Sequence, residues 1–257
     1  MKTVLITGCS SGFGLDTARY FLERDWNVIA TMRTVDASLL PASTNLRLLA
    51  LDVTHAASIE QAIAAAGPID VLVNNAGIGM LAALEGTSMD IARDVFATNT
   101  LGTIAMTQAV LPQFRARRAG VVVNVTSTVT VVPLPFLSVY TASKAAVNAF
   151  TECLAVELAS FGIRMSLVLP GRSPTTRFGA NASGRMAGGF PEAYAALKEQ
   201  VFAGMMDTTA AVTHGVDVAE AVWRAATDPA APIKLAAGAD AVQWAENSGD
   251  QRFVTPR

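Results

Sequence analysis

The sequence predicts an α/β protein built on a doubly wound parallel sheet with helices on both faces. Short apolar runs alternate with segments of helical periodicity along most of the chain, which is the order of βαβ units. Those runs are continuously apolar rather than alternating, as strands buried on both faces require. A chain of 257 residues with 51% apolar content can bury one substantial core, so we expect a single domain spanning residues 1–257.

The first unit is a strand, a glycine-rich turn and a helix. Residues 2–7 form a short apolar run, and Gly8-Cys9-Ser10-Ser11-Gly12-Phe13-Gly14 follows directly. The helix is indicated by apolar residues at helical spacing: Leu15, Ala18, Phe21 and Leu22. This order suits a nucleotide-binding loop, because glycines let the backbone approach a pyrophosphate and the helix N-terminus offers unpaired N–H groups to the anion.

Further strands are expected after the first. Their apolar runs are residues 26–32, 46–51, 71–74, 121–125, 164–169 and 234–236. Right-handed crossovers between parallel strands place the ligand crevice at their carboxyl ends. Gly8, Asn74, Ser127 and Pro170 each end or follow a predicted strand, so these separate segments should converge on one crevice.

Tyr140 and Lys144 lie four residues apart in an alanine-rich stretch, on one face of a predicted helix. An ammonium beside a phenol favours the phenolate, so the pKa of Tyr140, ordinarily about 10, is expected to move toward neutrality. Such a phenol can donate a proton to a carbonyl oxygen during reduction, and as phenolate it can accept one during oxidation.

These features together resemble the short-chain dehydrogenase/reductase family. The matching motifs run in order from residue 7 to about residue 175: Thr7-Gly8-x-x-x-Gly12-x-Gly14, Leu51-Asp52-Val53, Asn74-Asn75-Ala76-Gly77, Asn99, Ser127, Tyr140-x-x-x-Lys144, and Pro170-Gly171 with Thr175. The opening TGCSSGFG and the later ATMR resemble the branch that contains 17β-hydroxysteroid and retinol dehydrogenases. The resemblance implies a Rossmann fold and hydride transfer between a nicotinamide dinucleotide and a carbonyl or alcohol.

The resemblance also implies a role for each candidate catalytic residue. Tyr140 acts as general acid or base, Lys144 assists it and binds the ribose hydroxyls, and Ser127 orients the substrate oxygen. Asn99 resembles the asparagine that holds a water linking Lys144 to solvent, the alternative being an asparagine that only kinks its helix. Besides Tyr140 and Lys144, the expected cofactor contacts are Gly8, Ser10, Ser11, Gly12, Phe13, Gly14, Arg33, Asp52, Val53, Asn75, Ala76, Gly77, Pro170, Gly171 and Thr175.

The end of the second predicted strand favours NADP(H) over NAD. NAD enzymes of this fold usually place an acidic residue there to bind the ribose hydroxyls. Here no such residue occurs before Asp36. Arg33 instead offers a planar guanidinium suited to a 2′-phosphate, and Ser10 can add a hydroxyl donor. The alternative is an Arg33 that only caps a surface turn, which would leave an NAD-dependent alcohol dehydrogenase.

The residues expected around the nicotinamide favour a hydrophobic ketone, aldehyde or secondary alcohol. Arg172 either binds a substrate carboxylate there or turns to solvent or to an acid such as Glu192. Residues 172–209, with many glycines and prolines and few apolar side chains, suit a substrate lid, the alternative being an ordinary surface loop. The expected substrate contacts are Met80, Ser127, Val129, Leu134, Tyr140, Arg172, Met186 and Phe190.

Several other classes of protein lack support in the sequence. A net charge of −2 without a run of basic residues gives no electrostatic basis for nucleic-acid binding. No signal peptide and no uninterrupted run of 18 apolar residues are found, which predicts a soluble cytoplasmic protein with no membrane contact. The two cysteines and two histidines form no metal motif, so no metal is expected. A regulator that senses NADP(H) without turnover remains as an alternative, which the complete catalytic set disfavours.

Two segments raise the question of neighbouring subunits. Residues 143–161 carry only Lys144, Glu152 and Glu157 as charges, and a helix that is apolar nearly all round must be covered on more than one side. In relatives this helix and the one around residues 99–114 pair across a twofold axis, so a homodimer or homotetramer is expected. The tail, residues 243–257, is polar without periodicity and either lies free or packs on a neighbouring subunit.

Overall fold

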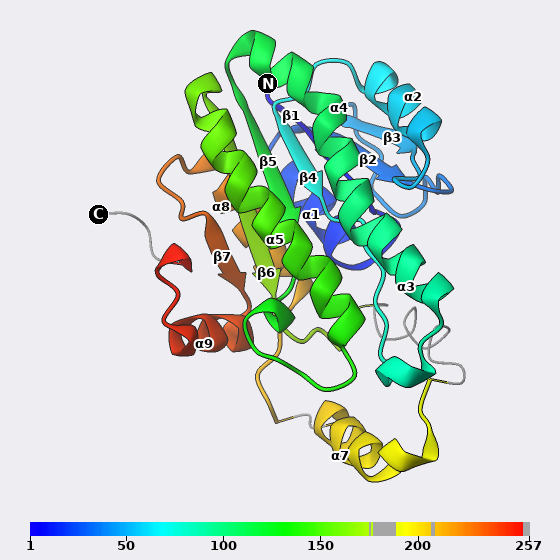
Figure 1. The fold of residues 1–257 in the computed structure, drawn as a ribbon. Coiled ribbons are helices and arrows are strands. Elements are labelled where there is room, and N and C mark those ends of the chain that lie inside the picture. Colours follow the sequence, from blue (N-terminus) through cyan, green and yellow to red (C-terminus); the bar gives the residue numbers. More distant parts are fainter. Residues whose placement is uncertain (175, 177–188, 207–208, 254–257) are drawn as a thin grey trace.

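A seven-stranded parallel sheet lies between two layers of helices in the computed structural model, which describes residues 1–174, 176, 189–206 and 209–253 (Figure 1). The strand order is β3-β2-β1-β4-β5-β6-β7. The doubly wound α/β fold is therefore confirmed, and each strand lies within one residue of its predicted bounds. The strands are β1 (Thr3–Ile6), β2 (Asn27–Met32), β3 (Leu46–Ala50), β4 (Val71–Asn74), β5 (Gly120–Val125), β6 (Ile163–Pro170) and β7 (Lys234–Ala237).

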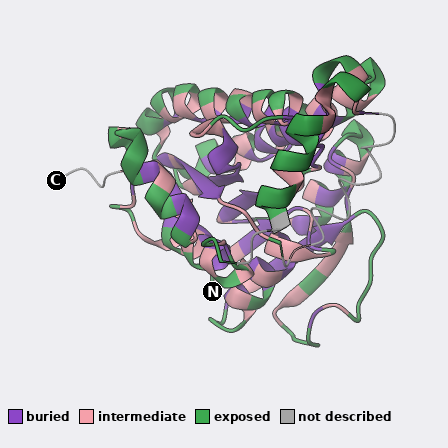
Figure 2. Cartoon of the chain, turned by 90° about the horizontal axis from the view of Figure 1, so that it is seen from below, coloured by how far each residue is buried: buried purple, intermediate pink, exposed green. Residues whose placement is uncertain are grey.

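The two faces of the sheet are covered by different helices. Side chains alternate along each strand, so in β1 Val4 and Ile6 pack in one core and Leu5 packs in the other. The first core is covered by α1 (Gly12–Leu22) and α8 (Gly215–Thr227), and the second by α2 (Ala56–Ala66), α4 (Gly102–Arg117) and α5 (Ser138–Leu158). Buried residues accordingly concentrate in the strands and on the inward sides of the helices (Figure 2).

Further helices complete the described part of the chain. The longest of them are α3 (Met89–Phe96), α7 (Ala195–Met206) and α9 (Ala239–Ser248). A π-helical segment, η2 (Ala97–Leu101), joins α3 directly to α4. The remaining turns are 3₁₀ helices: η1 (Leu84–Gly86), η3 (Thr128–Thr130), η4 (Ala159–Phe161), η5 (Glu192–Tyr194) and η6 (Gln251–Phe253).

The winding direction of the chain reverses beside β1, which pairs with β2 on one side and β4 on the other. The Thr7 hydroxyl, just beyond β1, accepts hydrogen bonds from the backbone N–H groups of Asn75 at 3.0 Å and Ala76 at 2.9 Å. The glycine loop after β1 and the asparagine segment after β4 are thereby joined. This is the switch point where open α/β sheets bind ligands.

The segment expected as a lid contains a helix that was not predicted from the sequence. Residues 195–206 form α7, whose sequence is rich in Ala, Leu, Lys, Glu, Gln and Met, all good helix formers. The preceding turn is anchored to the rest of the chain by aromatic contacts. Phe136 lies with its ring centroid 5.0 Å from that of Phe190 and 6.0 Å from that of Tyr194, in edge-to-face arrangements.

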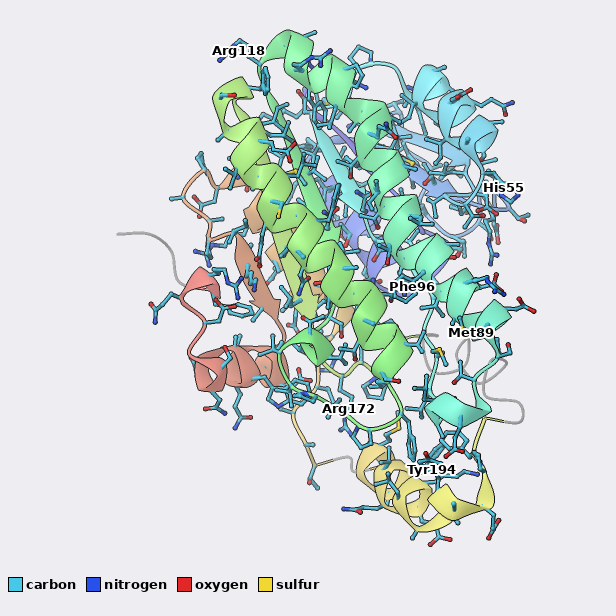
Figure 3. All side chains as sticks on the ribbon, in the orientation of Figure 1. His55, Met89, Phe96, Arg118, Arg172 and Tyr194 are labelled. Carbon is cyan, nitrogen blue, oxygen red and sulfur yellow. The ribbon has the colours of Figure 1, made fainter. Side chains whose placement is uncertain are left out.

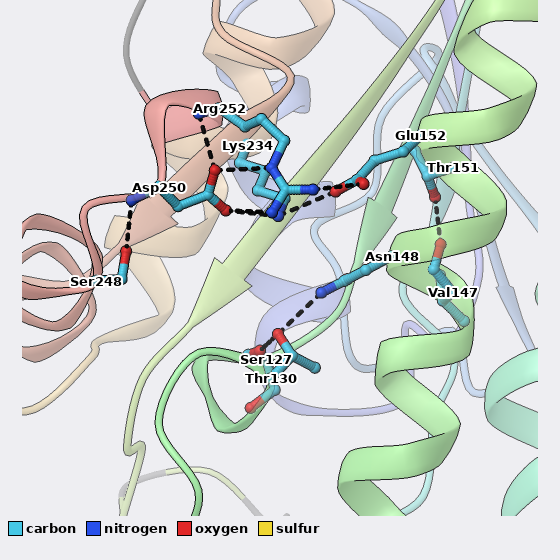
Figure 4. Close-up of polar contacts among 10 residues, drawn as sticks. All are labelled: Ser127, Thr130, Val147, Asn148, Thr151, Glu152, Lys234, Ser248, Asp250 and Arg252. Atoms are coloured by element: carbon cyan, nitrogen blue, oxygen red, sulfur yellow. Dashed lines mark hydrogen bonds and ion pairs between the residues drawn. The ribbon is translucent and has the colours of Figure 1, made fainter.

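The described part of the predicted tail is neither loose nor without structure. Residues 239–248 form α9, and η6 folds back on the chain through a cluster of ion pairs (Figure 4). Lys234 Nζ lies 2.8 Å from Asp250 Oδ2 and 3.0 Å from Glu152 Oε1, while Arg252 Nη1 lies 2.7 Å from Glu152 Oε2. We call these four residues the C-terminal ion cluster. A single sequence could not reveal it, because its members meet only in the folded chain.

Candidate active site

A cleft of about 540 Å³ opens at the carboxyl ends of β1 to β4. Its lining includes these residues expected to contact a cofactor: Gly8, Ser10, Ser11, Gly12, Phe13, Arg33, Asp52, Val53, Asn75, Ala76 and Gly77. Residues outside the predicted cofactor contacts also line it: Met32, Leu51, Thr54, Ile78, Gly79, Asp94, Ala97, Thr98 and Thr176. Ile78 and Gly79 simply continue the asparagine segment, whereas no motif marked the side of the cleft formed by α3.

The glycine loop has a geometry that only glycine permits at two positions. Gly8 has φ +76°, in the left-handed region. A Cβ atom on Gly14 would lie 2.4 Å from Asn75 Nδ2 and 2.5 Å from the carbonyl oxygen of Gly8. Asn75 Nδ2 donates to the carbonyls of Thr7 at 2.9 Å and Gly8 at 3.2 Å, which locks the loop against the asparagine segment.

Helix α1 begins directly at this loop, and the side chain of its N-cap residue, Ser11, makes no capping hydrogen bond. The first N–H groups of the helix are therefore available to an anion, as is the positive end of the helix dipole. A narrow glycine loop opening onto such a helix end fits the pyrophosphate of a dinucleotide. The residues present thus suit the cofactor that the sequence motifs imply.

The four candidate catalytic residues are all buried in one place. Tyr140 and Lys144 are each 6% exposed on α5, Ser127 is 8% exposed beside η3, and Asn99 is 1% exposed in η2. Lys144 Nζ donates to the carbonyl of Val125 at 3.0 Å. A Cβ atom on Gly77, in the cleft lining, would lie 3.2 Å from both Lys144 Nζ and Asn99 Oδ1. The cleft therefore ends against this group.

Asn99 joins the cleft wall to α5. Its Oδ1 accepts from the N–H of Ile78 at 2.8 Å, and its Nδ2 donates to the carbonyl of Ile78 at 2.9 Å and to Ser143 Oγ at 3.0 Å. The π-helical turn that holds it is a helix irregularity of a kind that is frequent at functional sites. Asn99 therefore lies in a helix irregularity and joins the asparagine segment to α5.

The pKa of Tyr140 differs from the sequence expectation. Burial raises it above the ordinary value for a phenol, and a hydrogen bond with Ser127 opposes that rise without cancelling it. Burial also lowers the pKa of Lys144 to about 8. The expectation of a depressed Tyr140 pKa is wrong for this structure, because the sequence pattern showed the nearby ammonium but not the loss of water around the phenol.

Burial of Lys144 gives a testable pH dependence. Its pKa falls from an ordinary 10.5 to about 8, so below pH 8 the folded protein carries the full cost of a buried charge. Between about pH 8 and 10.5 only the unfolded chain keeps the proton, and stability rises with pH. Lys144→Met should therefore be more stable than the parent at pH 7, by up to roughly 3 kcal/mol, with the gap closing toward pH 10.5.

Urea unfolding of both proteins at several pH values would measure that gap. Lys2→Met, at an exposed lysine, is the control for the loss of a lysine side chain. A Lys144→Met gap that stays constant across the range would contradict the assignment.

The hydroxyl of Ser127 has a defined direction. Its Oγ accepts from the backbone N–H of Val129 at 3.3 Å. Because that lone pair is engaged, the hydroxyl proton remains available for Tyr140 or for a substrate oxygen.

The structure divides the expected substrate contacts into several groups. Met80 and Val129 share a buried apolar cluster with Tyr140, and Phe190 packs in a second cluster with Phe136. Leu134 is 38% exposed and belongs to neither cluster. Met186, like the expected cofactor contact Thr175, lies outside the described residues.

Pro170 and Gly171 lie beside the Ser127 turn rather than in the cleft lining. The Thr128 hydroxyl donates to the carbonyl of Pro170 at 3.1 Å. A Cβ atom on Gly171 would lie 2.1 Å from Asp240 Oδ2, so a buried carboxylate alone explains the glycine there.

Arg172 contacts the segment that was expected as a lid. Its Nη1 donates to the carbonyls of Gly204 at 3.1 Å and Met205 at 3.3 Å, at the last turn of α7 (Figure 3). A cation at a helix C-terminus is favoured by the dipole. These two hydrogen bonds join Arg172 to α7, within the segment expected as a lid, and the substrate carboxylate and its alternatives stay predictions.

Two negative observations apply to the described part of the chain. It contains no group of three or more His, Cys, Asp or Glu side chains placed to hold a metal ion. Within the same residues, no helix is both long enough and apolar enough to span a lipid bilayer.

Comparison with known proteins gives a consistent result. Residues 2–185 match the family described as short chain dehydrogenase. The chain is 40% identical over 181 residues to human retinol dehydrogenase 8, covering 66% of this chain and 58% of the relative. It is also 40% identical over 179 residues to mouse 17-beta-hydroxysteroid dehydrogenase type 1, covering 64% and 52%. The matched part thus spans less than two thirds of these relatives.

Solved structures of similar fold bind either dinucleotide. A short-chain dehydrogenase from Streptomyces avermitilis has a TM-score of 0.81 at 32% identity, covering 98% of this chain and 94% of the other. Serine dehydrogenase complexed with NADP+ gives 0.78 at 31%, covering 92% and 94%. A 3-ketoacyl-(acyl-carrier-protein) reductase from Brucella melitensis complexed with NADH gives 0.75 at 26%, covering 91% and 96%.

Proposed function

Because the chain belongs to the short-chain dehydrogenase family, we propose that it transfers a hydride between NADP(H) and a hydrophobic ketone, aldehyde or secondary alcohol. The observation that carries the proposal is the burial of Tyr140, Ser127, Lys144 and Asn99 together at the inner end of a cleft shaped for a dinucleotide. When bound there, the nicotinamide supplies or accepts the hydride. The protein must then supply the proton and hold the carbonyl.

Tyr140 and Ser127 provide those two functions. Ser127 donates its hydroxyl proton in a hydrogen bond to the substrate oxygen and so holds the carbonyl beside Tyr140. Tyr140 transfers its phenolic proton to that oxygen as the carbon is reduced, and Lys144 stabilises the phenolate that remains. Met80 and Val129, in the apolar cluster around Tyr140, exclude water from the reacting group.

The raised pKa of Tyr140 fits the role of proton donor in the cofactor-free protein. A phenol whose pKa lies above its ordinary value stays protonated throughout the neutral range, and the protonated form is the donor that carbonyl reduction needs. Alcohol oxidation would need the phenolate, which the buried site disfavours before a cationic group is bound beside it.

NADP(H) is favoured over NAD(H) by the charges at the open end of the cleft. Arg33 is exposed and lines the cleft together with Ser10. Asp36, the first acid after β2, directs its Oδ1 to the backbone N–H of Ser38 at 2.9 Å and to Ser38 Oγ at 2.6 Å, and it does not line the cleft. The NADH-bound neighbour keeps an NAD-dependent alcohol dehydrogenase as the second candidate.

A substrate panel tests the proposal. Purified protein should oxidise NADPH, followed as loss of nicotinamide absorbance, with steroidal, retinoid or aryl ketones and aldehydes, and more slowly with small polar ketones. The retinol and hydroxysteroid dehydrogenases among its relatives support the choice of bulky apolar substrates. If the protein binds NADPH but turns over none of the panel, a dinucleotide-sensing role replaces the enzymatic one.

We also propose that the chain forms a homodimer or homotetramer through α5. The outward side of this helix exposes a row of small or apolar residues: Ala142, Ala145, Ala149, Cys153 and Val156. Ala149→Glu should place a charge in that row and reduce the mass measured by light scattering to that of a smaller species. Ala57→Glu, on an exposed position of α2, should leave the mass unchanged. A parent protein that is monomeric at micromolar concentration would rule the assembly out.

The cysteines suit a cytoplasmic location, which we propose for the protein. Cys9 is buried and Cys153 exposed, and both are free thiols.

A further inference from the structure

We propose that Asn148 is a positioning residue, which acts through Thr130 to set the position of Ser127 relative to Tyr140. The inference rests on the proposed function in one respect: Ser127 and Tyr140 are taken to act on the same substrate oxygen.

Asn148 lies in a regular series of polar residues on α5. Tyr140, Lys144, Asn148 and Glu152 follow one another at intervals of four residues, so their side chains share a slowly turning side of the helix. The first two belong to the proposed reaction and Glu152 belongs to the C-terminal ion cluster. Asn148 stands between them, one helical turn beyond Lys144.

The side chain of Asn148 reaches the turn that carries Ser127 (Figure 4). Its Nδ2 donates to Thr130 Oγ1 at 2.9 Å, and Thr130 Oγ1 donates to the carbonyl oxygen of Ser127 at 2.8 Å. The Thr130 hydroxyl has one proton, which it gives to Ser127, so its remaining role toward Asn148 is that of acceptor. The two hydrogen bonds therefore form one directed chain from α5 to the backbone of Ser127.

This chain joins the turn to the helix of Tyr140, in addition to the hydrogen bond between Ser127 and Tyr140 and the bond from Lys144 Nζ to the carbonyl of Val125. On its other side the turn is held by the Thr128 hydroxyl, which donates to the carbonyl of Pro170 at 3.1 Å and so ties it to β6. The bond from the Val129 N–H to Ser127 Oγ, at 3.3 Å, is internal to the turn. Asn148 and Tyr140 lie on the same rigid helix, so the strut from Asn148 fixes the spacing between the serine and the tyrosine.

The arrangement is poorly explained by stability alone. Asn148 Oδ1 is buried and has no hydrogen-bond partner among the described residues. Burying an unpaired polar atom is unfavourable, and an apolar side chain of similar size would avoid that cost. The amide is instead explained by its Nδ2 group, which donates a hydrogen bond to Thr130 Oγ1.

Kinetics of four variants test the strut. Asn148→Leu and Thr130→Val should each lower kcat for carbonyl reduction by about 3- to 10-fold, the loss of one neutral hydrogen bond at the transition state, with the KM for NADPH changed less than about 2-fold. The double variant should be no slower than either single one, because both break the same chain. Thr130→Ser, which keeps the hydroxyl, should restore kcat.

Asn27→Ala and Thr3→Val form the matched control. Asn27 Nδ2 also donates to a threonine hydroxyl, Thr3 Oγ1, at 3.5 Å, but at the amino ends of β1 and β2, away from the cleft. These variants should leave kcat unchanged. Additive effects of Asn148→Leu and Thr130→Val on kcat would overturn the proposal. It would also be overturned if Asn148→Leu were partly unfolded at the assay temperature and the unfolded fraction accounted for the whole loss of kcat.

A second measurement does not depend on turnover. Amide hydrogen exchange in residues 127–131 should become faster in Asn148→Leu and in Thr130→Val, and stay unchanged in Asn27→Ala, whether or not a substrate has been found. Unchanged exchange in the first two variants would overturn the strut even if kcat falls. Faster exchange in a protein that reduces no ketone would keep the strut and reject the proposed function.

Discussion

Tyr140→Phe is expected to lower turnover by about 10² or more while dinucleotide binding stays close to that of the parent. The substitution removes only the phenolic oxygen, so the ring still fills its place in the apolar cluster with Met80 and Val129. Without that oxygen Ser127 can still hold the carbonyl, but the proton must come from water, and the loss of a general acid typically costs 10²–10⁴ in rate.

Steady-state turnover and NADPH titration of the parent and variant would measure both quantities. Tyr20→Phe is the control, because Tyr20 lies on α1 and stacks with Arg24 away from the cleft. The variant should match the parent in both assays. A Tyr140→Phe protein that keeps near-normal turnover would remove Tyr140 from the mechanism, and one that also loses dinucleotide binding would make the residue structural.

Arg33→Ala should weaken NADPH binding by roughly 10- to 150-fold and leave NADH binding nearly unchanged. A charge-assisted hydrogen bond to a phosphate contributes about 1.5–3 kcal/mol, which corresponds to that range of affinity. Arg33 lies on the cleft wall directly after β2, where a 2′-phosphate distinguishes the two dinucleotides. The substitution should therefore act on one cofactor rather than on both.

Fluorescence titration with each dinucleotide would provide the comparison. Arg224→Ala, on α8 and on the other side of the sheet from α5, removes an exposed arginine that does not line the cleft and should alter neither affinity. If Arg33→Ala weakens NADPH and NADH equally, or if NADH is the better substrate of the parent, the assignment of Arg33 to a 2′-phosphate is wrong.

The sheet could be predicted closely because strands buried on both faces read as plain apolar runs. Residues 71–74 are one such run, bounded by polar residues, and β4 has the same bounds. The motif residues follow the carboxyl ends of these strands. Their positions in the sequence therefore predict where the cleft lies, although not its shape. The lid region was harder, since its glycines and prolines hid the helix-forming stretch at Ala195–Met206.

Other features depend on distances that no local pattern contains. The raised pKa of Tyr140 follows from burial, and a spacing of four residues from Lys144 shows only that a cation is near. The contact of Arg172 with α7 required the position of a helix some thirty residues later in the chain. Asn148 was missed because an asparagine within a helix carries no signal until Thr130 is seen beside it.

The C-terminal ion cluster also bears on how the protein is made. Arg252 and its partner Glu152 on α5 are separated by 100 residues of sequence. At a synthesis rate of about 5–20 residues per second, α5 is translated roughly 5–20 s before the residues that pair with its far end. During that interval Glu152, on the helix that carries Tyr140 and Lys144, cannot pair with Lys234 or Arg252. The nascent chain can therefore form most of the cleft well before α5 gains these ion pairs.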